Sequence, residues 1–225
     1  MVKLITHEVS VREISNGNIW EGENGRLHLV GYDSHAQNPR LTYDFLCKLI
    51  CNFGRMGNYS DKGVDIETFR EDVRQALGQE ELPEGTLGDL ARLMNKAGGF
   101  AAPVYGLNHT ELHVSLSSFK GVDPHGWDSG VAGVIWANPQ DIRDYYNEEE
   151  VDKDRLFAEA EIEIDILDRW LSGDVYCVKS WEASQWKKLP NGGYEVTNDY
   201  EYVDDFIGFE AVRHMYPPLQ NNATP

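Results

Sequence analysis

The sequence has few cysteines, few basic residues and no long apolar run. The three cysteines, Cys47, Cys51 and Cys177, are odd in number and too few for a disulfide framework, which favours free thiols in a reducing compartment. No stretch approaches the ~20 apolar residues that a membrane helix needs. The opening MVKLITHEVSVREI lacks the apolar run of a signal peptide. We therefore expect a cytoplasmic protein that does not enter a membrane.

Cys47 and Cys51 have a spacing that would place them one turn apart on a helix, where they could hold a metal. No second pair of cysteines or histidines lies nearby in the sequence. We interpret both as small buried side chains and expect neither a metal nor a cofactor.

Basic residues are outnumbered: 20 Lys and Arg face 38 Asp and Glu, for a net charge of −18. Direct binding to nucleic acid or to an anionic membrane needs a basic surface, so both are excluded. The acid is concentrated in two segments. Residues 141–172 hold twelve acidic and four basic residues, and residues 195–210 hold six acidic residues and no basic one.

Apolar periodicity and turn residues predict the order of elements. Helical spacing is expected over residues 41–53, 65–77 and 86–98, and it makes an N-terminal helical layer. Short β-rich runs follow at 102–107, 111–119 and 131–137, then helices at 138–146 and 151–171, strands at 174–182 and 194–198, and a helix at 209–215. The fold class predicted is α+β, with one mostly antiparallel sheet packed against a long acidic helix. The predicted divisions are residues 1–98, with a β-rich start that includes a strand at 26–33 and then the helical layer, residues 99–216, which form the α+β core, and a frayed tail, 217–225.

The segment DPHGWDSGVAGVIW, residues 123–136, admits two interpretations. Ser129, His125 and Asp128 are the residue types of a nucleophilic triad, but neighbours in one loop rarely converge on one point, and no G-x-S-x-G elbow is present. The alternative is a structural turn. Asp128 and Ser129 would then bond nearby amides, Gly130 would supply a positive φ and Trp127 would anchor the loop on the core. We favour the turn and assign no catalytic residue.

Residues 103–176 resemble a family of small acidic proteins, encoded by phages and mobile elements, whose function is uncharacterised. The shared pattern is P-x-Y-x-x-x-H, W-D-S-G-x-x-G-x-I, R-x-x-Y and L-x-G-D-V-Y. It is carried here by Pro103, Tyr105, His109, Trp127, Asp128, Ser129, Gly130, Gly133, Ile135, Arg143, Tyr146, Leu171, Gly173, Asp174, Val175 and Tyr176. This chain departs from the family at Asn108 and at Thr110-Glu111. The resemblance implies an accessory protein that acts inside a bacterial cell.

The long helix is predicted to have two faces. Leu156, Ala160, Ile164, Leu167 and Leu171 form an inward row, while the acidic stripe on the opposite side consists of Asp154, Glu161, Asp165 and Asp168. Like charges four residues apart destabilise a helix by roughly 0.2–0.5 kcal/mol per pair. An acidic stripe without interleaved lysine therefore suggests a function for the charge beyond helix stability.

Three functions remain open. The favoured hypothesis is inhibition of a host defence complex, of the anti-restriction or anti-CRISPR type, through an acidic surface that mimics nucleic acid and binds a basic protein surface. The partner-binding residues would be the stripe, the second acidic cluster and two tryptophans: Asp199, Glu201, Asp204, Asp205, Trp181 and Trp186. The alternatives are a metal-dependent hydrolase or nuclease using His109 with Asp123, Asp128 and Asp174, and an interaction protein whose acidic face only confers solubility.

Overall fold

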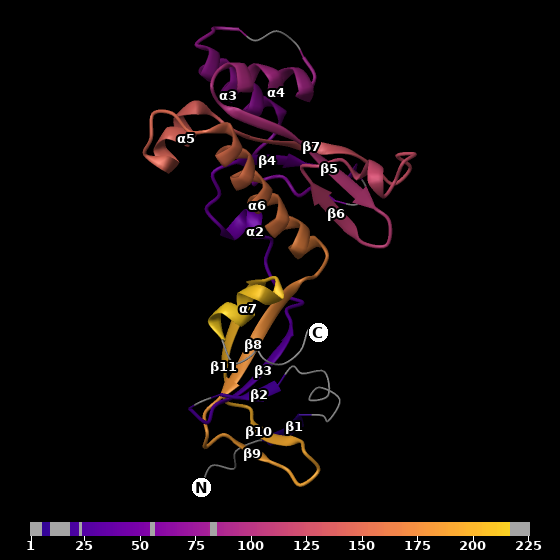
Figure 1. Ribbon diagram of the computed structural model, residues 1–225, viewed down its shortest axis with the longest axis vertical. Helices are drawn as coiled ribbons and strands as arrows, with labels where there is room; N and C mark the ends of the chain where they lie inside the picture. The colour runs from indigo at the N-terminus through magenta and orange to yellow at the C-terminus, as the bar shows by residue number, and fades with distance from the viewer. Residues whose placement is uncertain (1–5, 10–18, 23, 55–56, 82–84, 217–225) are drawn as a thin grey trace. The chain divides into compact units, whose positions relative to one another are not determined.

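The computed structural model describes residues 6–9, 19–22, 24–54, 57–81 and 85–216 and has an α+β fold whose paired strands are antiparallel (Figure 1). The chain divides into two compact units. A central unit comprises residues 37–172, and a terminal unit combines residues 1–36 with 173–225. The boundary expected between residues 98 and 99 falls inside the central unit, where a helix and the strand that follows it pack together. The tail at 217–225 lies outside the described residues.

The central unit is organised around a four-stranded sheet. Its strands are β4 (Lys48–Cys51), β7 (Ser129–Ala137), β5 (Phe100–Asn108) and β6 (Leu112–Ser115), in the spatial order β4-β7-β5-β6. All neighbouring pairs are antiparallel. The strand β6 therefore forms one edge of this sheet.

Helices cover both faces of this sheet (Figure 1). The helices α3 (Ile66–Leu77) and α4 (Leu87–Lys96) pack on one face, where Phe69, Leu90 and Met94 meet Trp136. The helix α6 (Lys153–Leu171) packs on the other face, against Ile135 and its neighbours. Consecutive residues of a strand point to opposite faces, so Ile135 and Trp136 serve two separate cores. The short helices α2 (Pro39–Thr42), α5 (Pro139–Tyr146) and η2 (Phe119–Gly121) complete the unit.

The helix ends follow the local sequence. Asp65 caps α3 by accepting hydrogen bonds from the amides of Glu67 and Thr68, and Gly78 ends it with a positive φ of 61°. Thr86 caps α4, and Asn138 caps α5 ahead of its first-turn proline. Asp, Thr and Asn at these N-cap positions and Gly at the C-terminal end are the residue types that favour helix boundaries.

The helix predicted over residues 41–53 is wrong. Only α2 is helical there; Leu41 is exposed, and Lys48–Cys51 form a strand that pairs with β7. Sheet pairing overrides the helical spacing of the apolar residues. Cys47 and Cys51 consequently do not share a helix face, but both are buried free thiols, and burial raises the pKa of Cys51 to about 12.

The terminal unit contains two further sheets, so the described residues hold three antiparallel sheets rather than one. One has the order β1-β10-β9, from Thr6–Val9, Tyr194–Thr197 and Trp186–Lys188. The other has the order β11-β8-β3-β2, from Glu201–Ile207, Val175–Trp181, Leu27–Tyr32 and Ile19–Glu21. The helix α7 (Phe209–Met215) packs on the second of these sheets through Val212.

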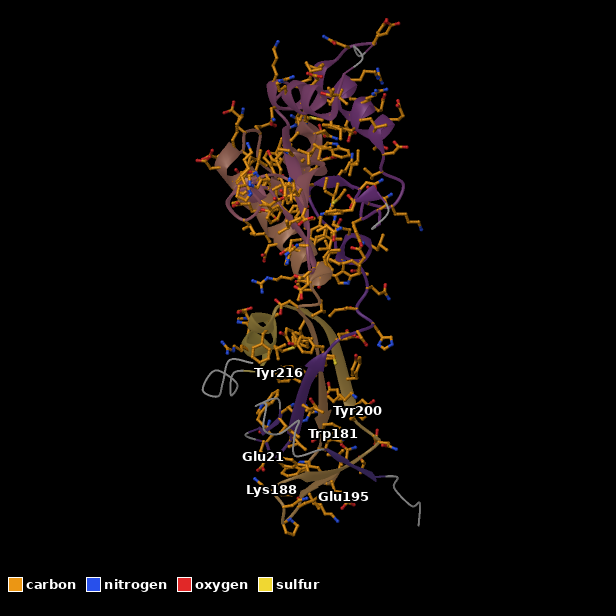
Figure 2. All side chains as sticks on the ribbon, turned by 90° about the vertical axis from the view of Figure 1, so that its right-hand side faces the viewer. Glu21, Trp181, Lys188, Glu195, Tyr200 and Tyr216 are labelled. Atoms are coloured by element: carbon orange, nitrogen blue, oxygen red, sulfur yellow. The ribbon has the colours of Figure 1, made fainter. Side chains whose placement is uncertain are left out.

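Aromatic side chains stabilise the terminal unit. Trp181 is fully buried, donates its indole N–H to the carbonyl of Thr197 at 2.8 Å and lies with its ring centroid 5.6 Å from that of Tyr200 (Figure 2). Nearby, the ammonium group of Lys188 lies 3.1 Å from a carboxylate oxygen of Glu21.

Across the described residues, no helix combines the length and apolar character needed to cross a bilayer.

Candidate functional site on helix α6

The helix α6 has the inward row that the sequence predicts. Leu156, Ala160, Ile164 and Leu167 are buried, and Leu171 packs at the edge of the same core. Asp152 caps the helix by accepting a hydrogen bond from the amide of Asp154. The acidic residues of α6 do not share one environment, however. Glu159 is half-buried and accepts a hydrogen bond from the hydroxyl of Tyr145 at 3.1 Å, and the others separate into three groups.

The first group is a buried carboxylate that sequence analysis missed. Glu163 is 1% exposed, and its carboxylate lies 2.9 Å from a guanidinium nitrogen of Arg40. Its other oxygen accepts the amide of Cys47 at 3.0 Å, while Arg40 also holds Asp61 in a two-point contact of 2.7 and 2.8 Å. Burial raises the pKa of Glu163 despite these partners. This cluster joins α2, β4 and α6 and is structural. The sequence contains a signal for this burial, because helical periodicity places position 163 on the same side of the helix as the apolar row.

The second group is Asp168, which the structure removes from the free acidic stripe. Its carboxylate accepts the backbone amide of Val114 at 2.7 Å and lies 3.2 Å from Nδ1 of His113. Both partners belong to the edge strand β6. Asp168 is therefore half-buried and closes part of a sheet edge, a device that discourages pairing with other strands. Asp168 therefore does not belong to a freely exposed acidic stripe, and its predicted partner-binding role stays a prediction.

The third group is exposed. Asp154, Glu161 and Asp165 are exposed, as are Glu149 and Glu150 in the loop before the helix. Asp165 pairs with Arg169 one turn later at 2.8 Å. Within the described part of the chain, the other four carboxylates have no cationic partner at salt-bridge distance. We call these five residues the acidic surface.

A groove of about 450 Å³ runs between β6 and α6. Its strand side consists of residues 113–116 and Phe119, and its helix side of Glu161, Ile164, Asp165 and Asp168. The groove therefore borders the acidic surface through two shared residues.

The second acidic segment is partly committed to local contacts. Asp199 accepts a hydrogen bond from the side chain of Gln185 at 3.1 Å, and Glu201 forms an ion pair with Arg26. Asp204 and Asp205 occupy a β-bulge of β11, where Asp205 has a positive φ of 60°. All four predicted residues are exposed.

The two tryptophans expected at an interface are not exposed anchors. Trp181 is fully buried, so its predicted partner-binding role is wrong. Trp186 is half-buried, donates its indole N–H to the carbonyl of Gly25 at 2.9 Å and packs on Tyr194. Both indole rings complete a small apolar core between strands.

The segment 123–129 is a turn whose organiser is Asp123. One oxygen of its carboxylate accepts the amides of Asp128 and Ser129 and the Ser129 hydroxyl, each at 2.9 Å. These hydrogen bonds, the amide of Asp128 first, hold the pKa of Asp123 below its ordinary value. The positive φ belongs to Gly126, at 65°, and Gly130 lies in β7 without one.

Trp127 is 85% exposed, so the prediction that it anchors this loop on the core is also wrong. Its described contact is with the ring of His125, 5.7 Å away between centroids. The turn is held by hydrogen bonds to Asp123 instead of by burial of an aromatic ring.

Comparisons of the chain with protein-family models, curated proteins and solved structures find no match. The acidic surface, with one of its five carboxylates paired to Arg169, attracts cations, and the partly apolar groove beside it can also contact the rest of a bound side chain.

The same geometry bears on the hydrolase alternative. The Ser129 hydroxyl is engaged with Asp123 rather than with a histidine. His109 lies 3.2 Å from Asp128, while Asp174 belongs to the terminal unit. No three His, Cys, Asp or Glu side chains among the described residues are grouped to hold a metal ion.

Proposed function

We propose that this protein acts by binding, and that the acidic surface docks on a basic surface of a protein partner. The observation that carries the proposal is a set of four exposed carboxylates that have no cationic partner at salt-bridge distance among the residues that the structure describes: Glu149, Glu150, Asp154 and Glu161. Each remains hydrated in the free protein, so an approaching cation meets no competing ion pair at these positions.

The spacing of these charges supports mimicry of nucleic acid. At a rise of 1.5 Å per residue, Glu161 and Asp165 lie about 6 Å apart along the helix axis, and Asp154 and Glu161 about 10 Å apart. Charges of a nucleic-acid strand also repeat at intervals of several Å. A groove that binds DNA or RNA through Lys and Arg would therefore also attract the acidic surface. Exposed charges of this kind speed association, and salt weakens the complex.

The resemblance to phage and mobile-element proteins supplies the biological context of the proposal. A protein of this kind meets host defence complexes, whose nucleases bind nucleic acid through basic clefts. We infer that the partner is a host nuclease or defence complex in the bacterial cytoplasm, and that occupation of its cleft inhibits it.

The test compares two triple variants with equal loss of charge. The first is Glu149→Gln, Glu150→Gln, Asp154→Asn, on the acidic surface outside the groove. The matched control is Glu67→Gln, Glu80→Gln, Glu81→Gln, which neutralises three exposed acids on and after α3. Immobilised wild type and both variants are incubated with host lysate at low and high salt, and the captured proteins are quantified.

We expect a basic nuclease to be captured by the wild type and the control at low salt, to be lost at high salt and to be lost from the first variant. The wild type and the control variant should both block DNA cleavage by that nuclease, and the first variant should not. Equal capture and equal inhibition by all three proteins would contradict the proposal and leave the acid as a solubilising feature.

A further inference from the structure

The groove between β6 and α6 has a chemistry of its own. The amide of Val114 points to Asp168 and hence away from β5. In an antiparallel pair the N–H and C=O of one residue point to the same side, so the carbonyl of Val114 also points away from β5, toward the helix side. Together with the carboxylates of Glu161 and Asp165, this makes a groove with several hydrogen-bond acceptors.

The walls of the groove are partly apolar. Ile164 and Leu116 contribute buried aliphatic side chains, and Phe119 adds a half-buried ring. A long aliphatic stem with a cation at its end matches such a surface, because the stem covers the apolar wall while the charge reaches the carboxylates.

The carboxylates of the groove differ in availability. Asp168 already holds the amide of Val114 and the ring of His113. Asp165 pairs with Arg169 on the exposed surface, an arrangement typically worth only about 0.3–0.5 kcal/mol and readily exchanged. Glu161 has no cationic partner at salt-bridge distance among the described residues. An incoming cation would therefore be held first by Glu161 and then by Asp165.

We propose that this groove receives a single arginine side chain of the partner, with its guanidinium between Glu161 and Asp165 and its stem along Ile164 and Leu116. The inference rests on the proposed function, since it names the group by which the basic partner is held. Arginine fits better than lysine because its planar guanidinium offers five donors to acceptors that lie on both the helix and the strand.

The intact protein, labelled with ¹⁵N, is titrated with the peptide acetyl-Gly-Gly-Arg-Gly-Gly-amide and with its lysine and citrulline counterparts. Citrulline keeps the shape of arginine without its charge. We expect the arginine peptide to shift the amides of Val114, Ser115 and Leu116, with the lysine peptide weaker and the citrulline peptide weakest. Binding of the citrulline peptide as tight as that of arginine would overturn the proposal.

Two variants of α6 give a matched comparison. Glu161→Gln should weaken the arginine peptide by about tenfold, because it removes a hydrogen bond to a charged group. Asp154→Asn removes one charge from the same helix outside the groove and should weaken it by less than about twofold. Both positions are exposed, and unchanged spectra of the free variants establish that the fold is retained.

The outcomes separate this inference from the proposed function. Equal weakening by the two variants means that charge alone attracts the peptide; the groove proposal then fails while the acidic surface stands. A tenfold effect confined to Glu161→Gln, together with normal partner capture by the triple variant on residues 149–154, supports the groove and contradicts the broader surface.

Discussion

The two acidic segments carry similar charge but use it differently. On α6, Glu163 is sealed inside the central unit, Asp168 closes a sheet edge, and Glu161 is exposed. The four acidic residues of 199–205 are all exposed, on a strand and the loop before it. Successive residues of a helix are rotated by about 100° about its axis, so a helix packed along one side places its carboxylates in different environments, whereas all four carboxylates of residues 199–205 lie at the surface. Acidic content alone therefore does not identify a binding surface.

The largest effect on stability is expected at the buried ion pairs of Arg40 with Glu163 and Asp61. Arg40→Met should lower the free energy of unfolding by about 3–5 kcal/mol, because Glu163 and Asp61 are left with uncompensated charge. Urea denaturation measures the change. Arg92→Met is the control, since Arg92 forms an exposed pair with Asp89 and should cost at most about 1 kcal/mol. Similar losses for both variants would show that the buried cluster is no more important than a surface pair.

The next effect concerns the edge of the sheet. Asp168→Ala leaves the amide of Val114 without its acceptor and should cost about 1–3 kcal/mol. Asp165→Ala, three residues earlier, loses only a surface pair and should cost roughly 0.5 kcal/mol or less. Hydrogen exchange gives an independent measurement: the Val114 amide should exchange faster in Asp168→Ala and at the wild-type rate in Asp165→Ala. Unchanged exchange in both would exclude an edge-closing role.

A pH series isolates Glu163. Because burial raises its pKa in the folded state above the ordinary value of 4.5, the folded protein binds this proton more tightly than the unfolded chain does. The resulting stabilisation is fully present below the unfolded pKa and is lost as pH rises through the folded pKa. The unfolding free energy of the wild type minus that of Glu163→Gln should therefore decrease as pH is raised across this window. A difference that rises or stays constant would contradict the assigned direction.

Local patterns were sufficient to predict the positions of many elements. Caps such as Asp65 and Asn138, and the apolar row of α6, depend on residues close in sequence, so their physics is visible in the sequence itself. The strand β4 was misread because its apolar residues also fit a helix, and pairing with β7 decides between the two.

The candidate site was predicted only in part. Asp154, Glu161 and Asp165 are exposed as expected, while Asp168 is not free, because β6 lies beside it. That neighbour comes from about 54 positions earlier in the chain, and nothing local to the helix reveals it. The environments of two tryptophans were mispredicted for the same reason. Trp127 was expected on the core and is exposed, and Trp181 was expected at an interface and is buried. Burial of an aromatic ring depends on which elements pack against it.

The smallest effect on stability is expected in the exposed acidic segment 199–205. Glu201→Gln removes one ion pair with Arg26, but Arg26 keeps Glu182 at 3.1 Å, so the loss of unfolding free energy should be at most about 1 kcal/mol. The loss should shrink further in 0.5 M salt, because exposed charges are screened. A salt-independent loss of several kcal/mol would mean that the strand segment, like Glu163, uses its acid to stabilise the fold, and the contrast between the two regions would fail.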